Sequence, residues 1–187
     1  MISRSEALEL LRQYLKDDKM VKHCIAVEAI MRALARRLGE DEELWGLIGL
    51  LHDIDYDITN RDLKVHGLKA LEILKGRLPD VAVEAIAAHN ENNGFRPSIP
   101  EAERIAVALR AADHMAGLIV ATALVMPNKK IAEIKIDTLK RKFRSKDFAR
   151  GVNRDRIRGI ERLGISLDEF FQIALEAMKS VAHELGL

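Results

Sequence analysis

Apolar residues recur three or four positions apart along almost the whole chain, with polar residues between them. This spacing places one apolar stripe on each predicted helix, as in helices packed around a common core. Two polar stretches, 54–64 and 90–99, interrupt the pattern, and Gly94 and Pro97 mark the second as a loop. The predicted helices span about residues 3–16, 20–38, 42–51, 65–75, 80–89, 98–125 and 166–186.

Three of these helices are predicted to begin at a capping box, in which a serine and a glutamate three residues later satisfy free backbone amides. The pairs are Ser3 with Glu6, Ser98 with Glu101, and Ser166 with Glu169. Ile134 and Ile136 alternate as in a strand, but a strand there would be isolated. The chain is therefore predicted to be all-α, a compact helical bundle. We expect one domain over residues 1–187, with residues 126–187 as a C-terminal helical extension.

Several residues that can bind metals lie on the apolar stripes of their own helices. They are His23, His52, His66, His89 and Asp113. Asp53 follows His52 where a helix ends, so its carboxylate can turn toward the same centre and bridge two ions. A buried carboxylate is costly unless it is paired or binds a metal. Imidazole nitrogen combined with carboxylate oxygen suits Mn, Fe, Co, Ni or Zn, so the sequence predicts one or two such ions bound by these six residues.

Each of these residues also has an ordinary explanation when it is taken alone. A histidine such as His23 can be a hydrogen-bonded core residue, and Asp113 can pair with Arg110 or Arg104. His66 can be a solvated first-turn residue, and His89 can sit at a helix C-terminus where the dipole favours it. The six residues together favour the metal centre. Two other histidines are set aside: His114, about 100° around the helix from Asp113, and His183, in the last turn of the last helix.

The charge balance gives no sign of a nucleic-acid or membrane surface, because 30 basic residues face 29 acidic ones, a formal net charge of +1. The single Cys24 excludes an internal disulfide and is interpreted as a small buried residue. No secretory signal is recognisable at the N-terminus. The apolar stretch 105–125 contains Arg110, Asp113 and His114, so it is predicted as a core helix. We expect a cytoplasmic protein.

The order of His23, the His52-Asp53 doublet and Asp113 resembles the HD superfamily of metal-dependent phosphohydrolases, over about Met20–Val125. The resemblance implies that these four residues hold one metal ion in a helical bundle. Members with two metals, such as the diadenosine tetraphosphate hydrolases of the YqeK type, have two further histidines, which match His66 and His89. In those members the doublet aspartate, here Asp53, bridges the metals. The strings LLHDIDY (50–56) and RKFRSKDFARGV (141–152) resemble an HD subgroup, and this further resemblance implies no particular substrate.

One departure from that pattern concerns phosphate binding. Many relatives carry a lysine two or three residues after the doublet, whereas this chain has Asp55 and Asp57. These two aspartates are interpreted as solvated loop residues, or alternatively as carboxylates that orient a histidine. Residues 137–162 hold ten Lys or Arg against four acidic residues, which suits a phosphate-binding wall or, equally, a solvated surface. The predicted substrate-binding residues are Lys142, Arg144, Lys146, Arg150 and Arg154.

The predicted function is a metal-dependent phosphohydrolase that cleaves a phosphate ester or phosphoanhydride of a small phosphorylated substrate, with a nucleotide as the expected substrate. His52, Asp53 and Asp113 are the predicted catalytic residues. A membrane is not an expected partner, given the balanced charge. A nucleic acid is not expected either, since Phe143 and Phe148 are the only aromatics in the basic region. A non-catalytic module that binds metal and a phosphorylated ligand is the first alternative. A structural bundle with a hydrogen-bonded polar core is the second.

Overall fold

The computed structural model describes all residues 1–187 and confirms the all-α prediction. The helices are α1 (Arg4–Tyr14), α2 (Asp18–Leu38), α3 (Glu42–Leu51), α4 (Leu68–Leu74), α5 (Asp80–Ala88), α6 (Pro100–Leu124), α7 (Ile136–Arg144), α8 (Arg154–Arg158), α9 (Leu167–Ser180) and α10 (Ala182–Leu185), with short 3₁₀ helices η1 (Ile131–Glu133) and η2 (Gly159–Leu163). There is no strand, only an isolated bridge between Lys75 and Leu78.

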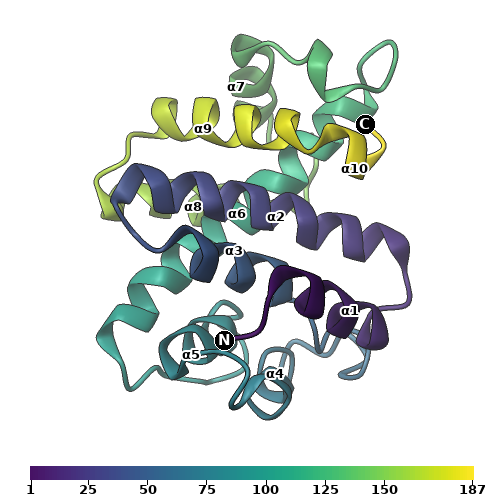
Figure 1. Cartoon of the computed structure of the whole chain (residues 1–187). Coiled ribbons are helices and arrows are strands. Elements are labelled where there is room, and N and C mark those ends of the chain that lie inside the picture. Colours follow the sequence, from purple (N-terminus) through teal and green to yellow (C-terminus); the bar gives the residue numbers. More distant parts are fainter.

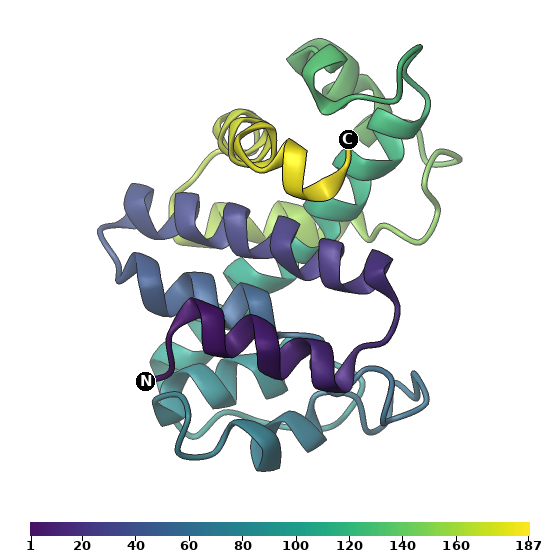
Figure 2. The same ribbon diagram turned by 45° about the vertical axis from the view of Figure 1, so that its right-hand side comes forward.

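Helix α2 crosses the middle of the molecule and packs against α3, α6 and α9. Figure 1 shows α1, α3, α4 and α5 on one side of α2, and α7, α9 and α10 on the other. In the turned view of Figure 2, α9 is seen nearly end on while α2 runs across the picture, so the two helices cross steeply. One hydrophobic core includes residues from Ala7 in α1 to Leu185 in α10.

Helices α2 and α3 approach each other closely because α3 has glycine where they meet. A Cβ on Gly49 would lie 2.8 Å from the backbone Cα of Glu28. The Glu28 carboxylate is buried and accepts hydrogen bonds from Arg4 at 2.7 Å and Arg32 at 3.0 Å. Arg32 also pairs with Glu43 on α3 at 2.7 Å. These contacts place the C-terminal end of α3, and therefore the doublet, beside α2.

Helix α6 is the core helix that the sequence predicts. It is the one helix long and apolar enough to span a membrane, yet 72% of its most apolar window is buried inside the protein. The capping box predicted for its start is wrong, because the N-cap residue is Ile99 and makes no side-chain cap. Ser98 instead bonds Glu84 of α5, through its backbone N at 2.8 Å and its Oγ at 2.6 Å.

Other predicted boundaries need smaller corrections. The capping box of Ser3 with Glu6 is present, and the Ser166 side chain accepts from the backbone N of Glu169. The second helix begins at Asp18, because Asp17 caps it. The fourth begins only at Leu68, so residues 52–67 form turns rather than the start of a helix. The last predicted helix is two, α9 and α10, joined at Val181, and Ile136 opens α7.

Candidate metal centre

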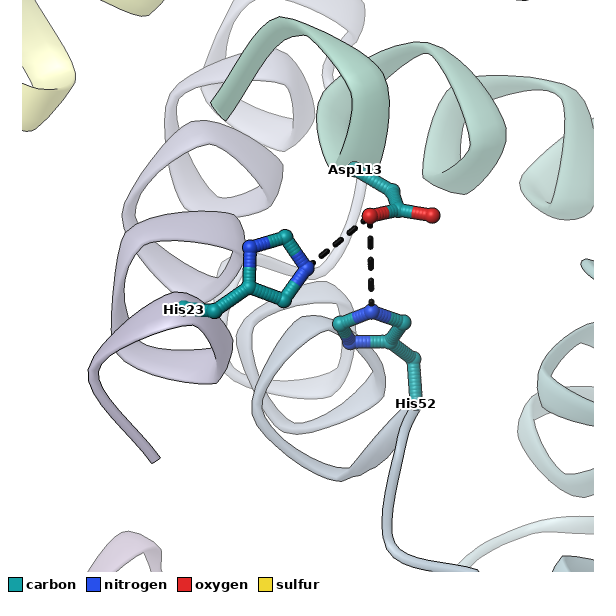
Figure 3. A group of neighbouring side chains, drawn as sticks. All are labelled: His23, His52 and Asp113. Atoms are coloured by element: carbon teal, nitrogen blue, oxygen red, sulfur yellow. Dashed lines mark hydrogen bonds and ion pairs between the residues drawn. The ribbon is translucent and has the colours of Figure 1, made fainter. Parts of the chain in front are cut away.

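Three side chains from three helices meet near the N-terminal end of α2. His23 comes from α2, His52 is the C-cap residue of α3, and Asp113 comes from α6. Figure 3 shows both imidazole rings turned toward the Asp113 carboxylate. Oδ1 of Asp113 lies 2.9 Å from Nε2 of His23 and 3.9 Å from Nε2 of His52. The convergence predicted from helix phase is therefore present.

The Asp53 carboxylate lies between two pairs of histidines. Its Oδ2 is 3.2 Å from Nε2 of His52 and 3.8 Å from Nε2 of His23. Its Oδ1 is 3.1 Å from Nε2 of His66 and 3.6 Å from Nε2 of His89. One oxygen thus faces each pair, the arrangement in which a carboxylate can bridge two ions.

The other ring nitrogen of three of these histidines is already engaged. Nδ1 of His52 donates to the carbonyl of Gly49 at 2.8 Å, and Nδ1 of His89 donates to the carbonyl of Ile86 at 2.5 Å. A neutral imidazole that donates from Nδ1 keeps a lone pair on Nε2. His52 Nε2 is fully buried with no hydrogen-bond partner, which is costly in a protein interior. The donor set and this unsatisfied nitrogen both fit a divalent transition metal.

Asp55 orients the third of these histidines. Its side chain is fully buried, and its Oδ1 accepts from Nδ1 of His66 at 2.7 Å. Its Oδ2 accepts from the backbone N of Gly67, Lys69 and Ala70, where α4 begins. The solvated interpretation of Asp55 is therefore wrong, and the alternative, a carboxylate that orients a histidine, is confirmed. Asp57 is half-buried and accepts from the backbone N of Lys16 instead.

His66 reaches the centre from a turn, not from the helical stripe that its sequence spacing predicts. Gly67 has φ +94°, a conformation that favours glycine, and it ends the turn before α4. The carbonyl of His66 accepts from the side-chain amides of Asn90 at 2.9 Å and Asn93 at 2.8 Å. These amides follow His89, so the two histidines of the second pair are tied together; their Nε2 atoms are 3.2 Å apart.

The ordinary explanations for the acidic residues do not hold. Arg110 pairs with Glu103 at 3.1 Å and Arg104 with Glu40 at 2.7 Å, so neither arginine partners Asp113.

Cys24 is not a good metal ligand, although it is buried near His52 and Asp53. Burial raises the pKa of its thiol, which disfavours the thiolate that binds metals.

The ionisation of the cluster follows from its packing. Burial opposes charge on His52, yet the neighbouring Asp53 carboxylate raises the pKa of His52 well above its ordinary value. Burial also opposes charge on Asp53, but His52, with hydrogen bonds from the histidines around it, holds the Asp53 pKa well below its ordinary value. Burial opposes charge on His66 as well, but hydrogen bonds to Asp53 and Asp55 raise the pKa of His66 to about 9. Burial lowers the pKa of His89. The metal-free cluster therefore holds protons that a metal must displace.

The cluster opens into a cleft of about 450 Å³. Its wall includes two residues outside the predicted site, His114 on α6 and Arg156 on α8. Tyr56 and Gly151 also line it. No sequence signal points to His114, since it lies off the stripe that carries Asp113, or to Arg156, since it is one of ten similar charges.

None of the five predicted substrate-binding residues lines this cleft. Four of them, Arg144, Lys146, Arg150 and Arg154, line a separate pocket, and Lys142 lies over the Phe148 ring at 4.5 Å. Arg154 donates to six backbone carbonyls between residues 142 and 152. It therefore holds the loop between α7 and α8 and has no N–H left for a substrate.

Comparison with known proteins points in the same direction as the geometry. The family model described as HD domain matches residues 20–117. The chain is 30% identical over 102 residues to Ribonuclease Y of Oleidesulfovibrio alaskensis, which covers 54% of this chain and 18% of that protein. No solved structure gives a significant match. The matched region begins just before His23 and ends just after Asp113, and it contains all six candidate ligands. The chain belongs to the HD domain family.

Proposed function

We propose that this protein is a metal-dependent phosphohydrolase that acts on a phosphate ester or phosphoanhydride of a small phosphorylated compound, with nucleotides as the first candidates. The observation that carries the proposal is the Asp53 carboxylate, with one oxygen toward His23 and His52 and the other toward His66 and His89. A phosphoryl group is a natural substrate for a site built to hold one or two divalent cations next to an open cleft.

The protein side chains have separate roles in this proposal. A bound divalent cation would supply an activated water and positive charge for the phosphoryl oxygens. His23, His52, Asp53 and Asp113 would hold the first ion, and His66 and His89 would complete a second position with Asp53. Only Oδ1 of Asp113 contacts histidine, so its Oδ2 is free to accept a proton from the attacking water.

The organic part of the substrate has a place beside the cleft. A second cavity of about 500 Å³ shares His23 with the cluster and is lined by apolar side chains that include Val120 and Leu124. Lys19 and Lys22 also line it. An apolar slot with two cations suits the base or another apolar group of a phosphorylated compound, with a further anionic group near the lysines.

The test is a hydrolysis screen with added Mn, Fe or Co against p-nitrophenyl phosphate, nucleotides and a short RNA. The double variant His52→Ala with Asp53→Ala should lose both metal and turnover. Equal turnover in wild type and double variant would refute the proposal. RNA belongs in the screen because the curated relative is named a ribonuclease, although this chain spans less than a fifth of it.

The alternative is a regulatory module that binds metal and a phosphorylated ligand without turnover. The acidic residues Asp55 and Asp57, where many relatives have lysine, favour it. Metal content of protein prepared without a histidine tag, together with ligand binding in the absence of hydrolysis, would identify this function. For either function we expect a cytoplasmic setting, in line with the single buried Cys24.

A further inference from the structure

Two N–H groups from separate helices face each other in the wall of the cleft. His114 follows Asp113 on α6, and Arg156 lies on α8, beyond the region that the HD domain model matches. Nη1 of Arg156 is 3.2 Å from Nε2 of His114. Both side chains line the same cavity as five of the six candidate metal ligands: His23, Asp53, His66, His89 and Asp113.

The hydrogen bonding of His114 shows which of its nitrogens carries the hydrogen. The backbone N–H of Asn153 donates to Nδ1 of His114 at 3.0 Å, which requires a lone pair on Nδ1. The ring is then the neutral form with its hydrogen on Nε2. Arg156 can also only donate. Two donors cannot satisfy each other, so both need an acceptor from outside the pair.

The Arg156 guanidinium is held in this orientation by its neighbours. Its Nε donates to Oε2 of Glu91 at 3.0 Å, and its backbone N is capped by the side chain of Asn153 at 3.2 Å. Arg158, two residues along the same helix, makes different contacts: it lies 5.0 Å from the Phe143 ring centre and pairs with Asp155 at 3.1 Å. Only Arg156 of these two lines the cleft.

We propose that Nη1 of Arg156 and Nε2 of His114 donate to oxygens of a phosphoryl group placed at the metal cluster. Arg156, in the C-terminal extension, would supply the positive charge that Asp55 and Asp57 in the turn after the doublet do not. The neutral His114 would add a second N–H donor. Arginine suits this role because its planar fork of N–H groups matches a phosphoryl oxyanion. A catalytic role for these two donors rests on the proposed function. Their binding of a phosphoryl oxyanion does not, because binding requires no turnover.

The first experiment measures inorganic phosphate binding to the zinc-loaded protein by calorimetry. Arg156→Gln should weaken phosphate binding about 10- to 100-fold, the usual effect of losing a charged hydrogen bond. The matched control Arg158→Gln should bind phosphate like the wild type. Metal content should be equal in all three proteins, because neither arginine is a ligand. Equal phosphate affinity in the two variants would overturn the proposal.

A second measurement needs no variant and so remains decisive if Arg156→Gln fails to fold. Phosphate added to the zinc-loaded wild type should shift the side-chain nitrogen resonances of His114 and leave those of His183, exposed on α10, unchanged. If the His114 resonances do not shift at saturating phosphate, Arg156 and His114 do not bind phosphate as proposed. If phosphate binding depends on Arg156 but no ester is hydrolysed, only the proposed phosphohydrolase activity is refuted. If hydrolysis has the same KM in wild type and Arg156→Gln, only the phosphate-binding role of Arg156 and His114 is refuted.

Discussion

Asp55 does two tasks with one side chain, since it fixes the ring of His66 and accepts three backbone N–H groups at the start of α4. In Asp55→Asn, one carboxylate oxygen becomes an NH₂ that opposes these donors. We expect metal affinity to fall about 10- to 100-fold, as for other partners of metal-binding histidines. Metal content by mass spectrometry after dialysis would measure it. Asp57→Asn, which affects contacts with Lys16 and Arg61 but none with a candidate ligand, should retain its metal; equal losses in both variants would contradict this role for Asp55.

The raised pKa of His66 predicts a pH dependence. Because its metal-free pKa of about 9 exceeds its ordinary value of 6.5, protonated His66 stabilises the metal-free fold below about pH 6.5, and this stabilisation is lost as pH rises through about 9. Metal binding needs the deprotonated ring, so affinity should rise up to tenfold per pH unit for each proton displaced. Calorimetry in buffers of different ionisation enthalpy would detect the released protons. An affinity independent of pH between 6 and 9 would exclude this competition.

Helical phase was sufficient to predict His23, His52, His89 and Asp113, because each lies on or at the end of a regular helix whose apolar stripe faces the core. It could not place Asp55, which lies in a turn without periodicity, or decide between its two interpretations. It also left His114 out of the site. A residue beside the apolar stripe can nevertheless line a cleft where the core is open, as His114 does. The charge run around Arg156 showed that a basic wall was possible but not which residue faces the site.

At the level of helices, opposite effects are expected for alanine at Gly49 of α3 and at Gly117 of α6. A Cβ on Gly49 would press against the α2 backbone at 2.8 Å, whereas a Cβ on Gly117 would meet only the Val152 side chain at 3.6 Å. Gly49→Ala should therefore destabilise the protein by about 1–3 kcal/mol. Gly117→Ala should be neutral or stabilising by up to about 1 kcal/mol, since alanine is the better helix former. Denaturant unfolding of both variants would test this, and equal stability would show that α3 can shift away from α2 freely.

The wrong capping box at Ser98 shows why helix starts are less predictable than helix faces. Ser98 and Glu101 have the right spacing, but Glu84 on α5 offers a carboxylate that Ser98 bonds through both its backbone N and its Oγ. Such a competitor depends on how α5 packs against α6, which local sequence does not contain. The box at Ser3 forms as predicted. At Ser166 only half of it forms: the serine caps the helix, while the Glu169 carboxylate pairs with Arg37 of α2.

For the whole molecule, the centre joins residues from α2, the end of α3, the turn after it, the end of α5, and α6. A bound metal would therefore stabilise the complete fold rather than one segment. At a free concentration 100 times its Kd, the metal should add about 2.7 kcal/mol. In a chain of this size that is a rise in Tm of about 5–10 °C, visible by calorimetry before and after chelation. His52→Ala should remove this difference; an unchanged Tm in the wild type would argue against a metal in the core.

The C-terminal extension should unfold together with the HD region, because α9 packs on α2 and their apolar residues belong to one core. The chain offers a built-in test, since its only tryptophan, Trp45, is buried in α3 on the other side of α2. Tryptophan fluorescence reports the HD region, whereas far-UV circular dichroism reports all helices. We expect the two denaturation curves to coincide. A loss of helical signal before the fluorescence changes would mean that residues 126–187 unfold on their own, and Arg156 would then be carried by a part that can leave the cleft.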